Sequence, residues 1–432
     1  MTPVCAVVGV LDDEAEGLAP AARAAITQAD VLIGGRRVLA RYGMLAPQAE
    51  QRDLTGAVAS VPDWVEAAAA DGQRVVVLAS GDPLCHGIGE RLVAALGPAR
   101  CRVLPAPSLV QLACARLGWS VARTAIASIH GRGAVDWSAQ TAAPEHPLAE
   151  VLRALEGHGE VAVYTATDLG ADWLARQLQA VGYTDAELAV AVAARLGWSD
   201  ELVQPPMPLS AAAAGSYPQP HVALLRRSPE AVQRPFAPAD ETFIQRSPQR
   251  GLITKREVRA VALSGLALTP ASRVWDIGTG SGAMALEAAR LCPQGHVWAM
   301  ERHAEDWAIA EANRRRFRLG NVTLHHGCAP EGLEAWPDPD AIFIGGSAGA
   351  LGTLIDEALR RLSPGGRLVL NVVTLENLQQ ATAHLDAAAS AGAVRWEAVQ
   401  LQAHRCHELA GMRAFRAENP VWIMMATKEA EG

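Results

Sequence analysis

Short apolar runs alternate along the chain with longer stretches in which apolar residues recur every three or four positions. The first pattern is typical of buried strands and the second of helices that pack on a sheet. In the first half the predicted strands are 5–10, 29–35, 75–79, 102–104, 125–129, 161–164, 188–192 and 221–225, and the predicted helices are about 18–29, 87–95, 107–117, 148–156 and 171–181. Residues 204–219, rich in Pro, Ala and Ser, are predicted as a loop.

The second half repeats the alternation of strand and helix and so predicts a doubly wound sheet. The predicted strands are 274–277, 296–300, 322–325, 367–373, 395–402 and 421–426, the last two as a terminal hairpin, and the predicted helices are 254–265, 283–291, 305–319, 354–362 and 376–389. The stretch 337–346, with an apolar centre and two glycines at its end, lies between 322–325 and 354–362. Residues 226–250 are polar and Pro-rich without a clear period. We place a boundary near residue 234, which predicts domains 1–234 and 235–432.

The strand at 274–277 leads into a glycine turn, with Asp276 before it and Glu301 at the end of the next strand. Such glycines let backbone approach a ligand, and an acidic residue about 20 positions later suits ribose hydroxyls. The turn lacks the Gly-x-Gly-x-x-Gly spacing of dinucleotide sites, which favours S-adenosylmethionine (SAM). The predicted contacts of this turn are Asp276, Gly278, Thr279, Gly280, Ser281, Gly282 and Glu301.

A second loop with candidate chemistry follows the apolar run at 75–79 and reads Ser80-Gly81-Asp82-Pro83. Gly81 permits a positive φ, and Asp82 is held extended by the following proline with its carboxylate open to donors. Taken alone, Gly-Asp-Pro is most often an ordinary turn.

The composition of the chain excludes several classes of protein. The net charge is -8, divided as -6 over residues 1–235 and -2 over 236–432, so neither half has the basic field of a nucleic-acid binder. Seven scattered cysteines without a Cys-x-x-Cys pair indicate free thiols. No basic segment precedes an apolar run at the start, and no apolar run reaches about 18 residues. We expect a soluble cytoplasmic protein without nucleic-acid or membrane partners.

Further stretches establish two resemblances. The C-terminal half resembles the class I SAM-dependent methyltransferase domain that acts on precorrin-6B in the cobalamin pathway, through the glycine turn and residues 254–259, 329–331, 343–347, 364–367, 373–376 and 419–421. The N-terminal half resembles the tetrapyrrole methylase family, whose class III fold differs, through residues 8–10, 29–35, 78–83, 87–89, 115–118, 130–132 and 195–197. Their fused order resembles the decarboxylating precorrin-6Y C(5,15)-methyltransferase family.

The resemblance implies cobalamin (corrin ring) biosynthesis. It implies methylation of precorrin-6B at carbons 5 and 15 and decarboxylation of the ring C acetate, giving precorrin-8. The C-terminal domain would act at carbon 15 and the N-terminal domain at carbon 5, with one SAM site per domain. Relatives of both domains self-associate, so we expect a homo-oligomer. The electron-rich ring carbon is itself the nucleophile, so no catalytic side chain is assigned.

The resemblance also carries individual residues over. In the C-terminal half it adds Ala329 near the adenine and Thr254 beside Lys255, which would close the pocket. In the N-terminal half the matching SAM contacts are Ser80, Gly81, Asp82, Cys85, Ser108, Thr165 and Gly197. Arg256, Arg259 and Arg405 are candidates for substrate carboxylates, because guanidinium forks suit them; the alternative is a solvated charged face. The histidines at 325–326 and 404–407 lack a four-ligand set, so no metal is predicted.

Two other functions remain open. An RNA methyltransferase could use either fold, but amino-methylating class I enzymes usually carry an Asn/Asp-Pro-Pro-aromatic loop where residues 343–346 read Phe-Ile-Gly-Gly. Alternatively, the N-terminal half could be a non-catalytic docking module. That idea is motivated by its first loop, which lacks later glycines of the family, and by Pro107, which supplies no backbone donor near Ser108.

Overall fold

The computed structural model describes residues 3–11, 17–131, 133–228, 236–246 and 253–429. By packing, these residues divide into two compact units. The first contains described residues up to 131 together with 158–175 and 188–228, and the second contains those of 132–157, 176–187 and the remainder. The boundary predicted near residue 234 lies outside the described residues. No helix in the described ranges is long and apolar enough to cross a membrane.

The first unit begins with a five-stranded, wholly parallel sheet in the order β3–β2–β4–β1–β5. Its strands are β1 (Cys5–Val10), β2 (Val31–Gly34), β3 (Glu50–Asp53), β4 (Val75–Ser80) and β5 (Cys101–Leu104), and its helices are α1 (Pro20–Thr27), α2 (Arg36–Tyr42), α3 (Val61–Ala70) and α4 (Ile88–Leu96). Alternate residues of β4 enter two separate hydrophobic clusters, Val77 one and Leu78 the other. The central strands are therefore covered on both faces, as parallel sheets require.

A second sheet of this unit has the order β6–β7–β10–β8–β9, and only the β6–β7 pair is parallel. Its strands are β6 (Thr124–Ser128), β7 (Glu160–Tyr164), β8 (Leu188–Ala194), β9 (Leu202–Pro208) and β10 (His221–Arg227). The helices of this part of the chain are α5 (Leu109–Leu117), α6 (Ala149–Gly157), α7 (Ala171–Val181) and α8 (Leu209–Ala214).

The loop predicted at residues 204–219 is wrong over residues 204–214, which form most of β9 and then α8. Pro205, Pro206 and Pro208 indicated a loop, because proline cannot donate to a sheet ladder. Among the described residues β9 is an edge strand that pairs with β8 alone, so one side of the strand needs no donors.

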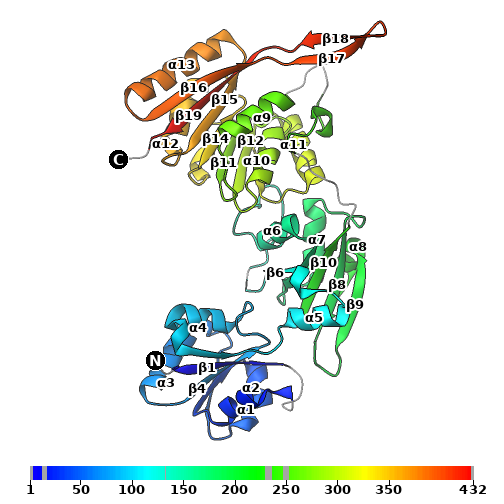
Figure 1. Cartoon of the computed structure of the whole chain (residues 1–432), viewed down its shortest axis with the longest axis vertical. Helices are drawn as coiled ribbons and strands as arrows, with labels where there is room; N and C mark the ends of the chain where they lie inside the picture. Colours follow the sequence, from blue (N-terminus) through cyan, green and yellow to red (C-terminus); the bar gives the residue numbers. More distant parts are fainter. Residues whose placement is uncertain (1–2, 12–16, 132, 229–235, 247–252, 430–432) are drawn as a thin grey trace. The chain divides into compact units, whose positions relative to one another are not determined.

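The second unit contains the doubly wound sheet, in the order β13–β12–β11–β14–β15–β19–β16 (Figure 1). Its strands are β11 (Arg273–Ile277), β12 (His296–Glu301), β13 (Val322–His326), β14 (Ala341–Ile344), β15 (Arg367–Val372), β16 (Val394–Leu401) and β19 (Val421–Lys428). Its helices are α9 (Arg256–Gly265), α10 (Ala283–Leu291), α11 (Ala304–Phe317), α12 (Leu351–Arg361) and α13 (Leu375–Ser390). Separate hydrophobic clusters pack on its two faces. The predicted sheet class is confirmed.

The predicted pairing of the last two strands is also confirmed, since β16 and β19 are antiparallel neighbours. Between them, however, lies an additional hairpin, β17 (His404–Leu409) and β18 (Met412–Ala417), which pair only with each other in the described part of the chain. The hairpin extends away from the seven-stranded sheet (Figure 1). Because most of its residues are exposed on both faces, it shows no apolar alternation from which it could be predicted.

Residues 133–157 contribute to the core of the second unit. The Ala139 carbonyl accepts a hydrogen bond of 3.0 Å from the backbone N–H of Leu324 in β13. The Trp137 ring covers the guanidinium of Arg314 at 4.0 Å, and the Arg314 side chain has no exposed surface. A segment from the first half of the sequence thus packs into the methyltransferase-like unit as an integral part.

Candidate functional site

The glycine turn of the second unit lies where the sheet order reverses, since β11 is flanked by β12 on one side and β14 on the other. Ligands bind at such switch points in open α/β sheets. Gly278, Gly280 and Gly282 have φ values of +74°, +57° and +81°. A Cβ on Gly278 would lie 2.7 Å from the Gly346 nitrogen, so this position accepts only glycine. The turn therefore presents backbone, without side chains, to the space beside it.

Glu301 fixes the turn from the neighbouring strand. Its Oε2 accepts a hydrogen bond from the Gly280 N–H at 3.0 Å, and its Oε1 accepts one from the His303 N–H at 2.9 Å. The residue is only 6% exposed. Since each carboxylate oxygen can accept more than one hydrogen bond, Glu301 retains acceptor capacity for a diol.

Asp276 lies beneath the turn and is almost fully buried. Its Oδ2 accepts a hydrogen bond of 2.6 Å from the Thr279 hydroxyl, whereas Oδ1 has no partner. The buried Ser281 hydroxyl also lacks a partner. Burial, reinforced by the Glu301 charge, raises the pKa of Asp276 to about 7. Buried polar atoms are normally satisfied, so these two are available to a ligand or an ordered water.

An open cleft lies beside the turn. It is lined by Gly278, Gly280, Glu301, Ala329, Gly345 and Gly346, among others. The cleft combines a backbone floor, an acidic rim at Glu301 and nearby unpartnered polar atoms. A nucleoside carrying a cationic sulfonium fits this combination, because the Glu301 carboxylate favours positive charge and offers the diol an acceptor. Ala329, predicted near the adenine, lines the cleft, whereas Thr254 is not among the lining residues.

In the first unit, the ends of β1, β4 and β5 approach one another closely. Gly81 has φ +70°, and its N–H donates to the Val10 carbonyl at 2.8 Å. A Cβ on Gly81 would lie 3.3 Å from the Pro107 carbonyl oxygen, and one on Gly9 would lie 2.5 Å from the Ala106 nitrogen. Three loops thus meet through backbone at the carboxyl edge of the parallel sheet, the edge where such sheets bind ligands.

The predicted contacts on this edge reach the second sheet of the same unit. The Cys85 Sγ lies 3.3 Å from the hydroxyl of Tyr164, the last residue of β7, and burial raises the pKa of Tyr164. The adjacent Thr165 is buried and donates to the His221 carbonyl at 2.5 Å. The Asp82 carboxylate accepts from the Leu84 N–H at 2.8 Å. Tyr164 was not predicted from the sequence, because nothing in the apolar pattern around it distinguishes it from a core residue.

Two other predicted contacts have structural roles already. The Ser108 hydroxyl caps α5 by accepting from the Gln111 N–H at 3.1 Å, with the Gln111 side chain bonding back. The Gly197 N–H, at φ +80°, donates to Glu201 at 2.8 Å. Ser80 accepts from Arg37 at 3.3 Å, and that guanidinium lies 5.4 Å from the Trp198 ring. Ser80 and the loop that contains Gly197 are therefore joined through one arginine.

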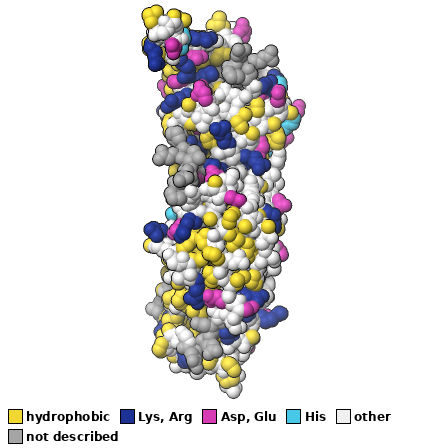
Figure 2. Space-filling model, turned by 90° about the vertical axis from the view of Figure 1, so that its right-hand side faces the viewer, with side chains coloured by type: hydrophobic (Ala, Val, Ile, Leu, Met, Phe, Trp, Pro, Cys, Tyr) yellow, Lys and Arg dark blue, Asp and Glu magenta, His cyan; other side chains and the backbone are white. Residues whose placement is uncertain are grey.

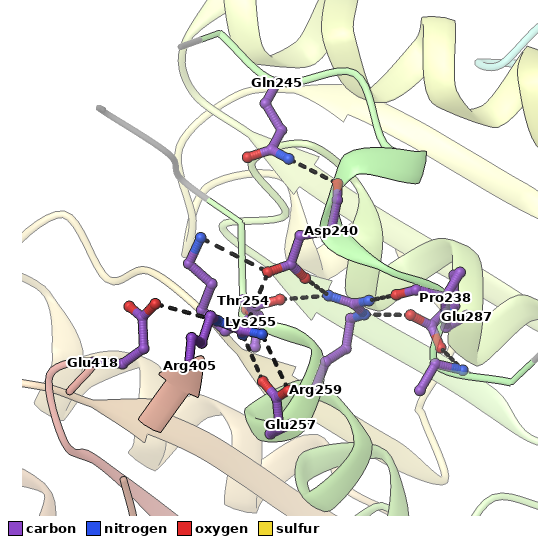
Figure 3. A network of polar contacts seen from close by, with 11 residues as sticks. Pro238, Asp240, Gln245, Thr254, Lys255, Glu257, Arg259, Glu287, Arg405 and Glu418 are labelled. Carbon is purple, nitrogen blue, oxygen red and sulfur yellow. Dashed lines mark hydrogen bonds and ion pairs between the residues drawn. The ribbon is translucent and has the colours of Figure 1, made fainter. Parts of the chain in front are cut away.

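Two of the three arginines predicted to bind substrate, Arg259 and Arg405, belong to an ionic network at the start of α9 (Figure 3). Arg259 is fully buried and pairs with Glu287 and, at 3.0 Å, with Asp240. It also donates to the carbonyls of Pro238 and Thr254, at 2.6 Å each. Four of its five N–H donors are thus used inside the protein. The substrate role predicted for Arg259 is corrected: this residue ties α9, α10 and the segment at 237–245 together.

Arg405, on β17, is partly exposed and forms a bidentate pair with Glu257, with distances of 3.2 and 2.7 Å. It also contacts Glu418 at 3.2 Å. Lys255 lies 3.7 Å from Asp240, and Arg256 is exposed. Arg256 and the outer edge of Arg405 therefore stay as predictions for substrate carboxylates, and Arg405 additionally anchors the hairpin to α9 (Figure 3).

Charges elsewhere are mixed. On the face drawn in Figure 2, basic and acidic side chains are interspersed over the surface. Within the described residues, no three or more His, Cys, Asp and Glu side chains are grouped as metal ligands.

Together, a doubly wound sheet with a glycine turn and acidic rim, and a parallel sheet with a Gly-Asp-Pro loop, define a SAM-dependent methyltransferase. Residues 4–212 match the family of tetrapyrrole (corrin/porphyrin) methylases, and residues 248–428 match the precorrin methyltransferase domain. The chain belongs to the family of decarboxylating precorrin-6Y C(5,15)-methyltransferases, which are C-methyltransferases of cobalamin biosynthesis.

Three relatives illustrate the match. A precorrin-6Y C(5,15)-methyltransferase [decarboxylating] of Sinorhizobium sp is 34% identical over 87% of this chain and 86% of its own length. The Mycobacterium tuberculosis protein of the same name is 30% identical over 98% of this chain and 99% of its own. A cobalt-precorrin-6B C(15)-methyltransferase (decarboxylating) of Salmonella typhimurium is 42% identical over 41% of this chain and 90% of its own.

Proposed function

We propose that each half of the chain holds one SAM and delivers one methyl group to a precorrin ring. The C-terminal half would methylate carbon 15 and decarboxylate the ring C acetate, and the N-terminal half would methylate carbon 5. The observation that carries the C-terminal assignment is the Glu301–Gly280 bond, which joins the acidic rim to a side-chain-free turn at the switch point. The Salmonella relative, named for carbon 15 alone, aligns with 177 residues of this chain.

In the C-terminal cleft, SAM supplies an electrophilic methyl group on a sulfonium. The residues of this chain orient the SAM molecule and enclose it. Gly278 and Gly280 let the backbone reach the ligand, and Glu301 accepts from the ribose. Asp276 and Ser281 do not line the cleft, and their unpartnered oxygens lie buried in the turn behind it. Methyl transfer depends on aligning the methyl group with the attacking carbon more than on a charged catalytic side chain. Backbone groups that hold SAM in place can provide this alignment.

In the N-terminal half, the meeting of the loops at Gly9, Gly81 and Ala106 supports a second SAM site. Here too backbone approaches backbone so closely that side chains cannot intervene. Ser80, Asp82 and Cys85 lie in the same loop region as Gly81 on this edge. Cys85 contacts Tyr164 of the second sheet. A binding module without catalysis would not need a thiol, a carboxylate and a buried phenol on one edge.

The experiment that tests the assignment keeps the full chain, because residues 133–157 pack into the C-terminal unit. Gly81→Ala and Gly278→Ala are each incubated with precorrin-6B and SAM labelled in the methyl group, and the labelled carbons are located by NMR. Gly81→Ala should retain methylation at carbon 15 and release of carbon dioxide but lose methylation at carbon 5. If it still methylates carbon 5, the N-terminal half is a docking module.

The proposed partners follow from the same chemistry. The substrate is a tetrapyrrole, and its carboxylates would meet Arg256 and Arg405 rather than a nucleic-acid backbone. The seven cysteines are all free thiols, as suits a reducing cytoplasm. Family membership supports this over the RNA methyltransferase alternative.

The β17–β18 hairpin is the proposed self-association surface. Leu409, Met412 and Phe415 are 58%, 69% and 73% exposed, and both hairpin edges are open within the described chain. Exposed apolar side chains on an open-edged hairpin favour pairing with a second copy.

A further inference from the structure

The motif His130-Gly131, which follows β6, is part of the resemblance but has no role in SAM binding as proposed above. Its histidine lies at the same edge of the first unit as the predicted SAM contacts. The His130 Nδ1 is 3.3 Å from the carbonyl oxygen of Thr165, and the backbone N–H of Ile129 donates to the Tyr164 carbonyl at 3.0 Å. His130 is therefore fixed beside the end of β7, where Tyr164 contacts Cys85.

The contact with Thr165 determines the tautomer. A carbonyl oxygen can only accept a hydrogen bond, so Nδ1 must carry the hydrogen. In the neutral ring, Nε2 then holds a lone pair. The residue is exposed, and no hydrogen bond to Nε2 is formed by a described residue. The structure thus holds an exposed base, oriented through Nδ1, beside Thr165 on the edge that carries the predicted SAM contacts.

The chemistry at carbon 5 requires such a base. When a ring carbon that carries a hydrogen attacks the methyl group, a carbon–carbon bond forms and the carbon–sulfur bond breaks, with sulfur keeping the electron pair. The ring adduct is cationic. Loss of the carbon-bound proton returns the carbon–hydrogen electron pair to the conjugated system, and the proton must pass to an acceptor.

We infer that His130 is the general base that removes the proton from carbon 5 after methyl transfer in the N-terminal site. The Nε2 lone pair takes the proton, the imidazolium stays hydrogen-bonded through Nδ1 to Thr165, and the proton then passes to water. This inference rests on the proposed N-terminal methylation.

A second histidine on this edge serves as the comparison. His86 follows Cys85 directly, is exposed, and has its ring centroid 5.6 Å from that of Tyr164. Its backbone N–H donates to Glu90 at 2.6 Å, but none of the hydrogen bonds found within the described residues involves its ring nitrogens. Its ring therefore lacks the fixed tautomer of His130, and we assign it no proton transfer.

The test compares His130→Gln with His86→Gln in the full chain, using substrate with hydrogen or deuterium at carbon 5. His130→Gln should slow carbon 5 methylation by about 10²- to 10⁴-fold, the usual contribution of a general base. It should also enlarge the deuterium isotope effect, because proton removal becomes limiting. SAM binding and the carbon 15 step should be unchanged, and His86→Gln should stay within about threefold of wild type.

An independent readout needs no turnover: nitrogen-15 NMR of selectively labelled histidine should show His130 with hydrogen on Nδ1. Hydrogen on Nε2 would overturn the inference, as would a His130→Gln variant with normal carbon 5 methylation or with slowed methylation and an unchanged isotope effect. Failure of the proposed function itself looks different, since wild type would then bind no SAM at the N-terminal site.

Discussion

Glu301 and Gly280 are joined by a 3.0 Å hydrogen bond from the glycine N–H to the carboxylate, although 21 positions separate them in the sequence. The bond links the end of β12 to the turn after β11. Because the same turn packs against Gly346 beyond β14, three strand ends form one rigid edge around the cleft.

This packing makes Gly278 irreplaceable. Gly278→Ala should abolish SAM binding to the C-terminal cleft, because the new Cβ would lie 2.7 Å from the Gly346 nitrogen at a φ of +74°. Gly365→Ala is the matched control, with φ +75° and nothing within 4 Å. Both variants should pay about 1–2 kcal/mol for the left-handed backbone. Calorimetric titration should show loss of binding in the first only; equal affinities would contradict the site.

The ionic network predicts a large effect at Arg259. Arg259→Met leaves Glu287 and Asp240 without their buried cation, which should cost about 3–5 kcal/mol of unfolding free energy. Arg256→Met, at an exposed position three residues earlier, should change stability by less than about 0.5 kcal/mol. Denaturant unfolding measures both, and a small loss for Arg259→Met would show that the network contributes little.

Asp276 should make stability depend on pH. Burial raises its pKa to about 7 in the folded chain, from an ordinary value of 3.8. Between these values the unfolded state releases a proton that the folded state keeps, so the unfolding free energy falls as pH rises, by up to about 1.4 kcal/mol per unit. Asp276→Asn removes this titration. In calorimetry its stability relative to wild type should therefore improve from pH 5 to pH 8, and an unchanged difference would contradict the assigned pKa.

The β17–β18 hairpin should mediate self-association of the chain. Replacing Leu409, Met412 and Phe415 together by Ser should convert a homo-oligomer into a monomer in light scattering, without loss of SAM binding. Leu375→Ser, at a 72% exposed position on α13, is the control and should leave the mass unchanged. A triple variant that keeps the mass of the wild type would place the interface elsewhere.

Most of the fold could be predicted from the sequence where strands are buried on both faces. The runs at 75–79 and 274–277 are apolar because helices cover both sides of their sheets, and each ends in a glycine whose positive φ marks the turn. The edge strand β9 and the exposed hairpin β17–β18 were missed for the opposite reason. Edge strands tolerate proline, and a hairpin exposed on both faces has no apolar period.

Contacts among the candidate site residues could be predicted where one sequence pattern links those residues. Asp276, the glycines and Glu301 lie within about 25 positions and meet as their spacing indicates. Arg259 was misjudged because no sequence pattern connects it with its buried partners Asp240 and Glu287. Tyr164 was missed because its contact with Cys85 spans 79 positions.

The central claim is that one chain carries two SAM sites. Equilibrium titration of the full chain with SAM should give two molecules bound per chain for wild type, one for Gly278→Ala and one for Gly81→Ala. One molecule bound by wild type, or two retained by Gly81→Ala, would contradict it.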